Sequence, residues 1–373
     1  MNYACHQSKG GLRTLAWPIA VIAVGSAMRL RSTRFMVVPE DSIRMPEPSK
    51  WRSLPTEQIN PATLRIDKLD AADIVSQMLS EDRKMIAAVE REKNRIASGI
   101  DLMTEAIRNG GRIIFVGAGT SGRLGVLEAA EIPPTFGTDP DFVQAIMAGG
   151  KGAVFRAREG AEDNYQKGSR SLARLRPTRQ DVVVGVSASG ITQFVFGALD
   201  RARRAGSKII LVTCDPKSEL QTSVDLIIAP AVGPEIIAGS TRLKAGSATK
   251  LVLNMLTTAS MIRTGKTYGN LMVDVRMGSE KLRDRARRIV SLVTGLQYDD
   301  ADKLLQRAHG NVKAAIVMHK RGLSYNQSLS RLDRAQGFVS EAVGEDVERR
   351  LKSLLRSSDV ERSKVRASAR SLS

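Results

Sequence analysis

Apolar residues recur at every third or fourth position from residue 70 to residue 109. This spacing places them on one face of a helix. The apolar positions include Ile74, Met78, Val89, Ile96 and Met103. Gly99 interrupts the pattern and predicts a division into two helices. Residues 1–53 carry prolines, mixed charge and no sustained period, so they are expected to form a flexible extension.

Short apolar runs then alternate with helical patterns, which is typical of β–α–β units. The five runs that predict strands are 112–116, 142–147, 181–186, 208–213 and 225–229. Helices are expected between them at 121–132, near 153–164, at 193–205 and around 217–223. We therefore predict an α/β fold with a doubly wound, five-stranded parallel sheet, whose ligands bind beyond the carboxyl ends of the strands.

Helical periodicity returns after the last predicted strand. Helices are expected at 243–263, 280–294, 299–308, 311–320 and 325–335. The domains that follow are an α/β domain with flanking helices at 54–295, whose core is 103–266, and a small three-helix bundle at 296–343. Residues 344–373, rich in serine and arginine, are expected to be a disordered basic tail.

Composition and charge narrow the class of protein. The chain has 373 residues, of which 42% are hydrophobic, and this is enough for a sizeable core. Its net charge of +18 could attract nucleic acid, anionic lipid or acidic metabolites. The basic residues are spread along the chain without a nucleic-acid reading motif, so no nucleic-acid partner is predicted. The apolar segment 15–28 is short for a membrane span, and a non-structural extension is favoured over an anchor or signal peptide.

Cysteine and histidine provide little for redox or metal chemistry. Cys5 and Cys214 are too few and too far apart to suggest a disulfide framework or a zinc site, which fits a reducing compartment such as the cytoplasm. The histidines His6, His309 and His319 are scattered. Neither a histidine-based triad nor a metal site is therefore predicted.

The run GAGTSGRLG at 117–125 follows the first predicted strand and opens a helix. Its glycines fit the dinucleotide fingerprint G-x-G-x-x-G. A dinucleotide site also needs an acidic residue at the end of the second strand, and residues 147–151 (MAGGK) provide none. No P-loop sequence is present either. Gly119, Thr120 and Ser121 place hydroxyls and backbone amides at a helix start, which suits a phosphate monoester.

A second hydroxyl-rich turn follows the third predicted strand. It contains Ser187, Ser189 and Thr192, and a helix begins directly after it. Either turn alone could simply cap its helix. Because two such turns follow strands of one sheet, we predict that they hold one phosphate from two sides.

Longer motifs carry a specific resemblance to a known family. They are GAGTSGRLGVLEAAEIPPTFG at 117–137, REGAEDN at 158–164, STRLKAGSATKLVLNML at 240–256 and YGNLMVDV at 268–275. Over about 56–343 the chain resembles the N-acetylmuramic acid 6-phosphate etherases, with a sugar isomerase domain followed by a bundle like a ubiquitin-associated domain. The resemblance implies cleavage of the D-lactyl ether of the phosphosugar, without a cofactor, by a cytoplasmic homodimer.

The resemblance also assigns roles to charged residues. Glu131 matches the acid that protonates the departing lactyl oxygen, and Glu162 matches a second essential carboxylate. Our hypothesis is that Glu162 removes the C2 proton, which the C1 aldehyde of the open-chain sugar acidifies. Lys244, or Arg242 beside it, is a candidate partner for the phosphate or the lactyl carboxylate.

The distance between the predicted acid and the first turn raises a question. Glu131 follows Ser121 by ten residues, about 15 Å along an unbroken helix, which a hexose phosphate cannot bridge. Either the helix breaks before Pro133, or the acid serves a sugar held by a neighbouring subunit. We favour a homodimer with shared sites.

Three positions depart from the family pattern. The family usually shows S-G-R-T-P at the second turn and T-E-x-R-N-P near the start, whereas this chain has Ile191, Gln193 and Ile59 there. The loss of two arginines would weaken recognition of an anionic group.

The alternative function is a non-catalytic phosphosugar-binding regulator like the glucokinase regulatory protein. An aldose–ketose isomerase is less favoured, because the nearest histidines lie in the predicted C-terminal bundle.

Overall fold

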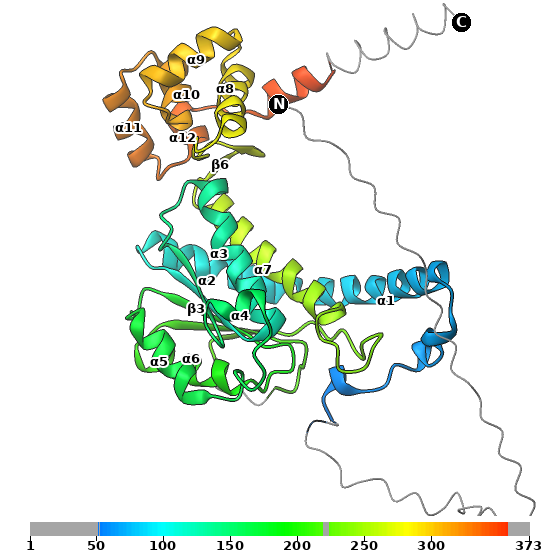
Figure 1. Ribbon diagram of the computed structural model, residues 1–373. Coiled ribbons are helices and arrows are strands. Elements are labelled where there is room, and N and C mark those ends of the chain that lie inside the picture. Colours follow the sequence, from blue (N-terminus) through cyan, green and yellow to red (C-terminus); the bar gives the residue numbers. More distant parts are fainter. Residues whose placement is uncertain (1–50, 52, 219–223, 357–373) are drawn as a thin grey trace, which may run out of the picture. The chain divides into compact units, whose positions relative to one another are not determined.

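The computed structural model describes residues 51, 53–218 and 224–356 (Figure 1). The apolar segment 15–28 and nearly all of the expected N-terminal extension lie outside these residues, as does most of the helix expected around 217–223. Three short 3-10 helices, Pro55–Glu57, Pro61–Thr63 and Ile66–Lys68, open the described part of the chain.

The central sheet is parallel throughout and has five strands. They are β1 Ile113–Gly117, β2 Val143–Met147, β3 Val182–Val186, β4 Lys208–Val212 and β5 Leu226–Ile228. Their order is β2-β1-β3-β4-β5, and every neighbouring pair is parallel. The predicted five-stranded parallel sheet is confirmed. The strand order reverses between β1 and β3, which makes the crevice at their carboxyl ends the expected ligand site of such a sheet.

Helices cover both faces of the sheet, as expected of a doubly wound fold (Figure 1). The helices on one face are α1 Ala71–Arg91, α2 Lys93–Arg108, α3 Gly119–Phe136 and α7 Lys244–Arg263. Those on the other face are α5 Tyr165–Arg174 and α6 Gln193–Arg204. Side chains alternate between the two cores: Phe115 of β1 lies in the first and Val116 in the second.

The break between the first two helices is not where the sequence predicted it. It falls at Glu92, whereas Gly99 lies inside α2 and is buried. A Cβ at Gly99 would lie 2.7 Å from Cδ2 of Leu256 on α7. The glycine therefore allows α2 and α7 to pack closely, and its prediction as a helix break was wrong.

The crossover between β2 and β3 also differs from the expected helix near 153–164. It consists of a short α4, Gly152–Phe155, a loop, and then α5. Asn164 caps α5 by accepting a hydrogen bond from the backbone N of Lys167 at 2.8 Å. This cap starts the helix after the REGAEDN motif, so Glu162 lies in a loop rather than on a helix.

The C-terminal part has a hydrophobic core of its own. It contains the hairpin β6 Thr267–Tyr268 and β7 Leu271–Met272, then α8 Glu280–Thr294, α9 Tyr298–Arg307, α10 Val312–Arg321, α11 Tyr325–Arg334 and α12 Val339–Val343. The sequence placed α8 with the α/β domain, but α8 packs with the C-terminal helices through Ile289 and Val290. Within the predicted tail, residues 348–356 are helical, and residues 357–373 lie outside the described part.

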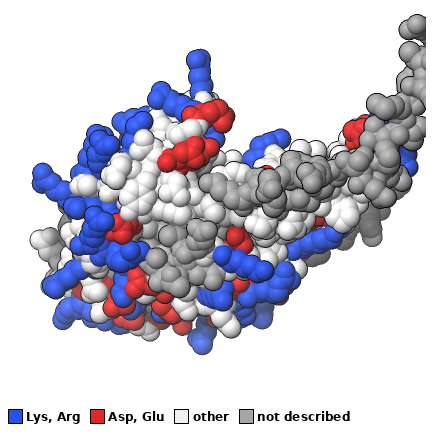
Figure 2. Space-filling view, turned by 90° about the horizontal axis from the view of Figure 1, so that it is seen from below, with Lys and Arg blue, Asp and Glu red and all other residues white. Residues whose placement is uncertain are grey.

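The surface charge is mixed on the face that Figure 2 shows. Lys and Arg side chains are spread over this face, with Asp and Glu among them. Among the described residues, no helix combines the length and apolar character needed to cross a bilayer.

Candidate active site at the strand switch point

The first turn joins β1 to α3 through a close contact of backbone with backbone. A Cβ at Gly117 would lie 2.6 Å from the N of Gly122, and a Cβ at Gly122 would lie 2.8 Å from the O of Gly117. Gly119 has φ +53, a conformation that favours glycine. No side chain caps α3. Its first amides therefore lie beside the hydroxyls of Thr120 and Ser121, an arrangement suited to an anion.

The second turn is held by its own hydroxyl groups. The Oγ of Ser187 lies 2.7 Å from Oγ1 of Thr192 and accepts a hydrogen bond from the N of Gly190 at 3.1 Å. Gly190 has φ +70, so the turn reverses tightly before α6. The half-buried Ser189 stands at its tip. The Ser187 hydroxyl thus shapes the turn, and Ser189 is the better placed to meet a ligand.

The two turns meet at one edge of the sheet. Gly117 and Val186 are partners in the parallel pairing of β1 with β3, so both turns begin side by side. The N-terminus of α7 joins them: a Cβ at Gly246 would lie 3.4 Å from Cγ2 of Thr120. The predicted phosphate-binding residues of the two turns are therefore brought together at the strand switch point.

Glu162 lies beside the second turn although it is far from it in sequence. Its backbone O accepts a hydrogen bond from the N of Phe194, in the first turn of α6, at 2.8 Å. The side chain is half-buried. This contact fixes the loop that carries Glu162 against the helix that follows Thr192. The backbone of Glu162 thus lies beside the start of α6, next to the second hydroxyl-rich turn of the same chain.

Glu131 does not share that region. It is exposed, and α3 continues beyond it to Phe136, through Pro133 and Pro134. A break before Pro133 was one of the two alternatives for bringing the acid to the sugar, and the structure has no such break. Glu131 therefore stays about 15 Å along the helix from Ser121.

Lys244 is near the site, but its side chain is used inside the protein. It is buried, and its Nζ donates to Oε2 of Glu81 at 2.6 Å. Burial alone would raise the pKa of the Glu81 carboxyl, but hydrogen bonds from Lys244, Lys84 and Asn60 outweigh it and lower the pKa to about 2. Arg242, in contrast, is exposed. The Lys244 ammonium is therefore already paired inside the protein, and Arg242 is the exposed basic side chain of this motif.

Replacing Lys244 with methionine is expected to destabilise the fold by about 3–5 kcal/mol, because it leaves the Glu81 carboxylate buried without its buried partner. Lys84→Met removes an exposed partner of the same carboxylate and should cost about 1 kcal/mol or less. The Glu81 contribution should be complete above the ordinary pKa of 4.5 and disappear as the pH falls toward 2. Urea unfolding of both variants at pH 7 and pH 3 measures this. Equal losses of unfolding free energy in the two variants at pH 7 would contradict the assignment of Lys244 as the main partner of Glu81.

Two of the three positions that depart from the family pattern, Ile191 and Gln193, lie at the second turn. Ile191 and Gln193 line a cavity of about 570 Å³, together with Trp51, Gln58 and Phe196. Ile59, the third departure, follows Gln58 in sequence and is 71% exposed. The arginine missing at Ile191 would thus have stood on the wall of this cavity, which is neutral at Ile191 and Gln193.

Sequence reasoning missed two buried carboxylates that support the site. Glu81 holds Lys244 across 163 residues of sequence. Glu235 accepts the backbone N–H groups of Lys244 and Ala245, both at 2.9 Å, and so caps α7. No local pattern marks either residue. In the described part of the chain, no group of three or more His, Cys, Asp or Glu side chains could hold a metal ion.

The fold, the switch point and the paired hydroxyl turns define a protein of the sugar isomerase (SIS) domain class. The glucokinase regulatory protein N-terminal SIS domain matches residues 95–203, and the SIS domain matches residues 165–259. N-acetylmuramic acid 6-phosphate etherase of Salinibacter ruber is 48% identical over 81% of this chain and 99% of its own length. The etherase of Clostridioides difficile is 46% identical over 78% of this chain and 96% of its own length. N-acetylmuramic acid 6-phosphate etherase 2 of Vibrio cholerae is 48% identical over 79% of this chain and 96% of its own length. The chain belongs to the N-acetylmuramic acid 6-phosphate etherase family.

Proposed function

We propose that this protein cleaves the D-lactyl ether of N-acetylmuramic acid 6-phosphate, giving N-acetylglucosamine 6-phosphate and D-lactate. The observation that carries the proposal is the 48% identity to a curated etherase over 99% of its length. The site supports it, because the two turns and Glu162 lie together at the switch point. We place this carbon–oxygen lyase in cytoplasmic amino-sugar catabolism.

The reaction needs one base, one acid and water. Glu162 takes the proton from C2 of the open-chain sugar, and the C2 electron pair forms a double bond to C3. The C3–O bond breaks, and the lactyl oxygen receives a proton from Glu131 as D-lactate leaves. Water then adds its hydroxyl to C3 and a proton to C2 of the unsaturated aldehyde. Such proton transfers contribute about 10²–10⁴-fold each to the rate.

Heavy water tests this function. Incubated with N-acetylmuramic acid 6-phosphate in deuterium oxide, the protein should release D-lactate and yield N-acetylglucosamine 6-phosphate with deuterium at C2. Mass spectrometry measures the deuterium, and an enzymatic lactate assay measures the second product. If the substrate binds but neither lactate nor C2 deuterium appears, the protein is not an etherase.

The alternative is a non-catalytic phosphosugar-binding regulator. The match of residues 95–203 to the glucokinase regulatory protein SIS domain favours it. Such a regulator needs the two phosphate-binding turns but no acid or base. The same heavy-water experiment separates the two functions, since a regulator would bind the phosphosugar and return it unlabelled.

We also propose that the enzyme is a homodimer with shared active sites. Glu131 is exposed and lies too far along α3 to reach a sugar bound at Ser121 of its own chain. A two-fold dimer would bring Glu131 of one subunit to the turns and Glu162 of the other. Each site would then be incomplete without a second copy.

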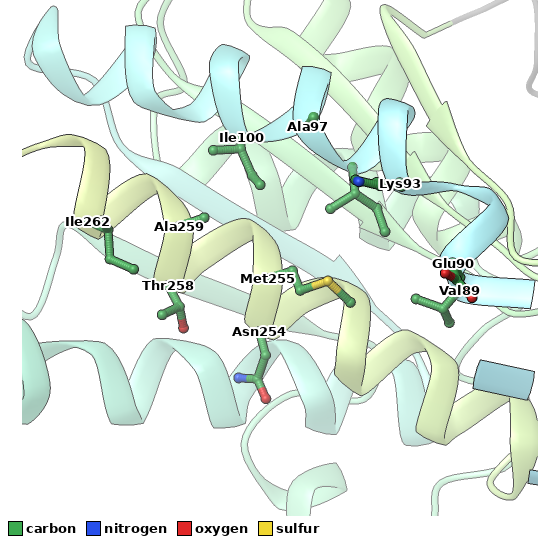
Figure 3. Close-up of a pocket in the computed structure, with 11 residues that line it drawn as sticks. Val89, Glu90, Lys93, Ala97, Ile100, Asn254, Met255, Thr258, Ala259 and Ile262 are labelled. Atoms are coloured by element: carbon green, nitrogen blue, oxygen red, sulfur yellow. The ribbon is translucent and has the colours of Figure 1, made fainter. Parts of the chain in front are cut away.

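An apolar groove next to α3 supports this dimer. The groove, about 700 Å³, lies between α2 and α7, with Ile100 and Met255 among its residues (Figure 3). Asn254, also on its wall, donates to Oε1 of Glu128 on α3 at 2.7 Å. Glu131 follows Glu128 by three residues and lies about one helical turn farther along α3, where it is exposed. A second copy that covers the groove would therefore lie close to Glu131.

A further inference from the structure

The end of α3, which carries Glu131, is weak as an isolated helix. Pro133 and Pro134 lie within it and have no N–H to donate to the carbonyls of the preceding turn. The hydroxyl of Thr135 compensates in part by donating to the O of Glu131 at 2.8 Å. The helix then ends at Gly137 in the left-handed conformation, with φ +64. The direction of this last turn must therefore be fixed by contacts from outside the helix.

Two outside contacts hold this end: Ile132 and Phe136 are buried in the core of the α/β domain, and the segment that leads into the C-terminal helices packs against Gly137. A Cβ at Gly137 would lie 2.2 Å from the backbone O of Asp274, so the end of α3 presses directly on this residue. The flanking residues Val273 and Val275 are buried in the core of the C-terminal helices. The end of α3 and the C-terminal core thus meet at Asp274.

Two lysines hold the carboxylate of Asp274. Lys266, just after α7, lies 3.2 Å from Oδ2, and Lys313, in the first turn of α10, lies 2.5 Å from the same atom. Lys313 is only 7% exposed. Burial lowers the pKa of its ammonium, and the Asp274 carboxylate opposes the shift. A buried lysine from the C-terminal helices is therefore committed to the residue that supports the end of α3.

We propose that the Lys313–Asp274 ion pair is a positioning device for Glu131, so that the C-terminal helices take part in the elimination step without touching the sugar. The proposal rests on the proposed function. Glu131 transfers the proton, whereas Lys313 and Asp274 set where its helix turn stands. A displacement of about 1 Å at an acid can cost about 100-fold in rate.

Lys313→Met tests this role, because methionine keeps most of the volume and removes the charge. Lactate release should fall by about 10- to 100-fold, while exchange of deuterium into C2 of the unreacted substrate, which depends on Glu162, should change by less than about threefold. The KM should change little, since the two turns are untouched. Lys313→Arg should restore most of the lactate release.

The controls separate positioning from stability. Lys303→Met removes an exposed ion pair with Asp300 on α9 and should leave both rates unchanged. Asp274→Asn, which keeps the backbone contact with Gly137, should repeat the loss of lactate release; thermal unfolding identifies the folded fraction of each variant. A parallel fall in exchange and lactate release, or no change in either, would overturn the proposal. If the wild-type protein neither exchanges C2 nor releases lactate, the proposed function fails and this proposal with it.

Discussion

Glu131→Gln is expected to lower the rate of lactate release by about 10²–10⁴-fold, the usual contribution of a general acid. Glutamine keeps the shape of the side chain but has no proton to give to the lactyl oxygen. Removal of the C2 proton does not require Glu131, so deuterium should still enter C2 of the unreacted substrate. Parallel measurement of lactate and of C2 deuterium tests both halves of the expectation.

Two further variants make the result specific. Glu162→Gln removes the proposed base, so exchange at C2 and lactate release should both be lost. Glu159→Gln changes an exposed carboxylate three residues away and should behave as the wild-type protein does. Full lactate release by the Glu131 variant would show that Glu131 is not the acid. Loss of deuterium incorporation at C2 in that variant would show that Glu131, and not Glu162, is the base.

The α/β fold could be predicted because its sequence signals are local. Each strand is a short apolar run, since a parallel sheet is buried on both faces, and each run is separated from the next by a turn or helix. Gly99 shows where local reasoning fails. In the sequence, a glycine that ends a helix looks the same as a glycine that lets another helix pack closely. Only the contact with Leu256 on α7 shows that Gly99 is of the second kind.

In the site, too, contacts between residues close in sequence could be predicted, whereas contacts between distant residues could not. Ser187 and Thr192 are five residues apart and form one turn, so the sequence already shows their association. Lys244 was a candidate ligand because of its motif, and its buried partner could not be foreseen, since Glu81 lies 163 residues away and no pattern links the two. Glycines at the positions of Gly117 and Gly122 are found in dinucleotide-binding and in phosphosugar-binding turns, because both kinds of turn bring the helix and strand backbones into contact. The absence of a carboxylate after β2 was the more informative signal.

Mixed dimers provide the strongest test of a shared site. Co-expression of subunits carrying Glu131→Gln with subunits carrying Glu162→Gln should restore about a quarter of the wild-type activity, although each variant alone is nearly inactive. Random pairing makes about half of the dimers mixed, and in a two-fold dimer each mixed pair holds one intact site and one doubly defective site. Tandem affinity tags, one on each subunit, would isolate the mixed dimer and raise this to about half.

The opposite outcome is equally clear. If each chain supplied both carboxylates to its own site, every site in the mixed dimer would keep one defect, and no activity would return. The structure argues for recovery, because Glu162 lies against α6 beside the turns of its own chain whereas Glu131 stands exposed farther along α3. Dilution of the mixed dimer below its dissociation constant should then abolish activity, and activity of the separated subunits would contradict sharing. Sedimentation at the assay concentration shows which species is present.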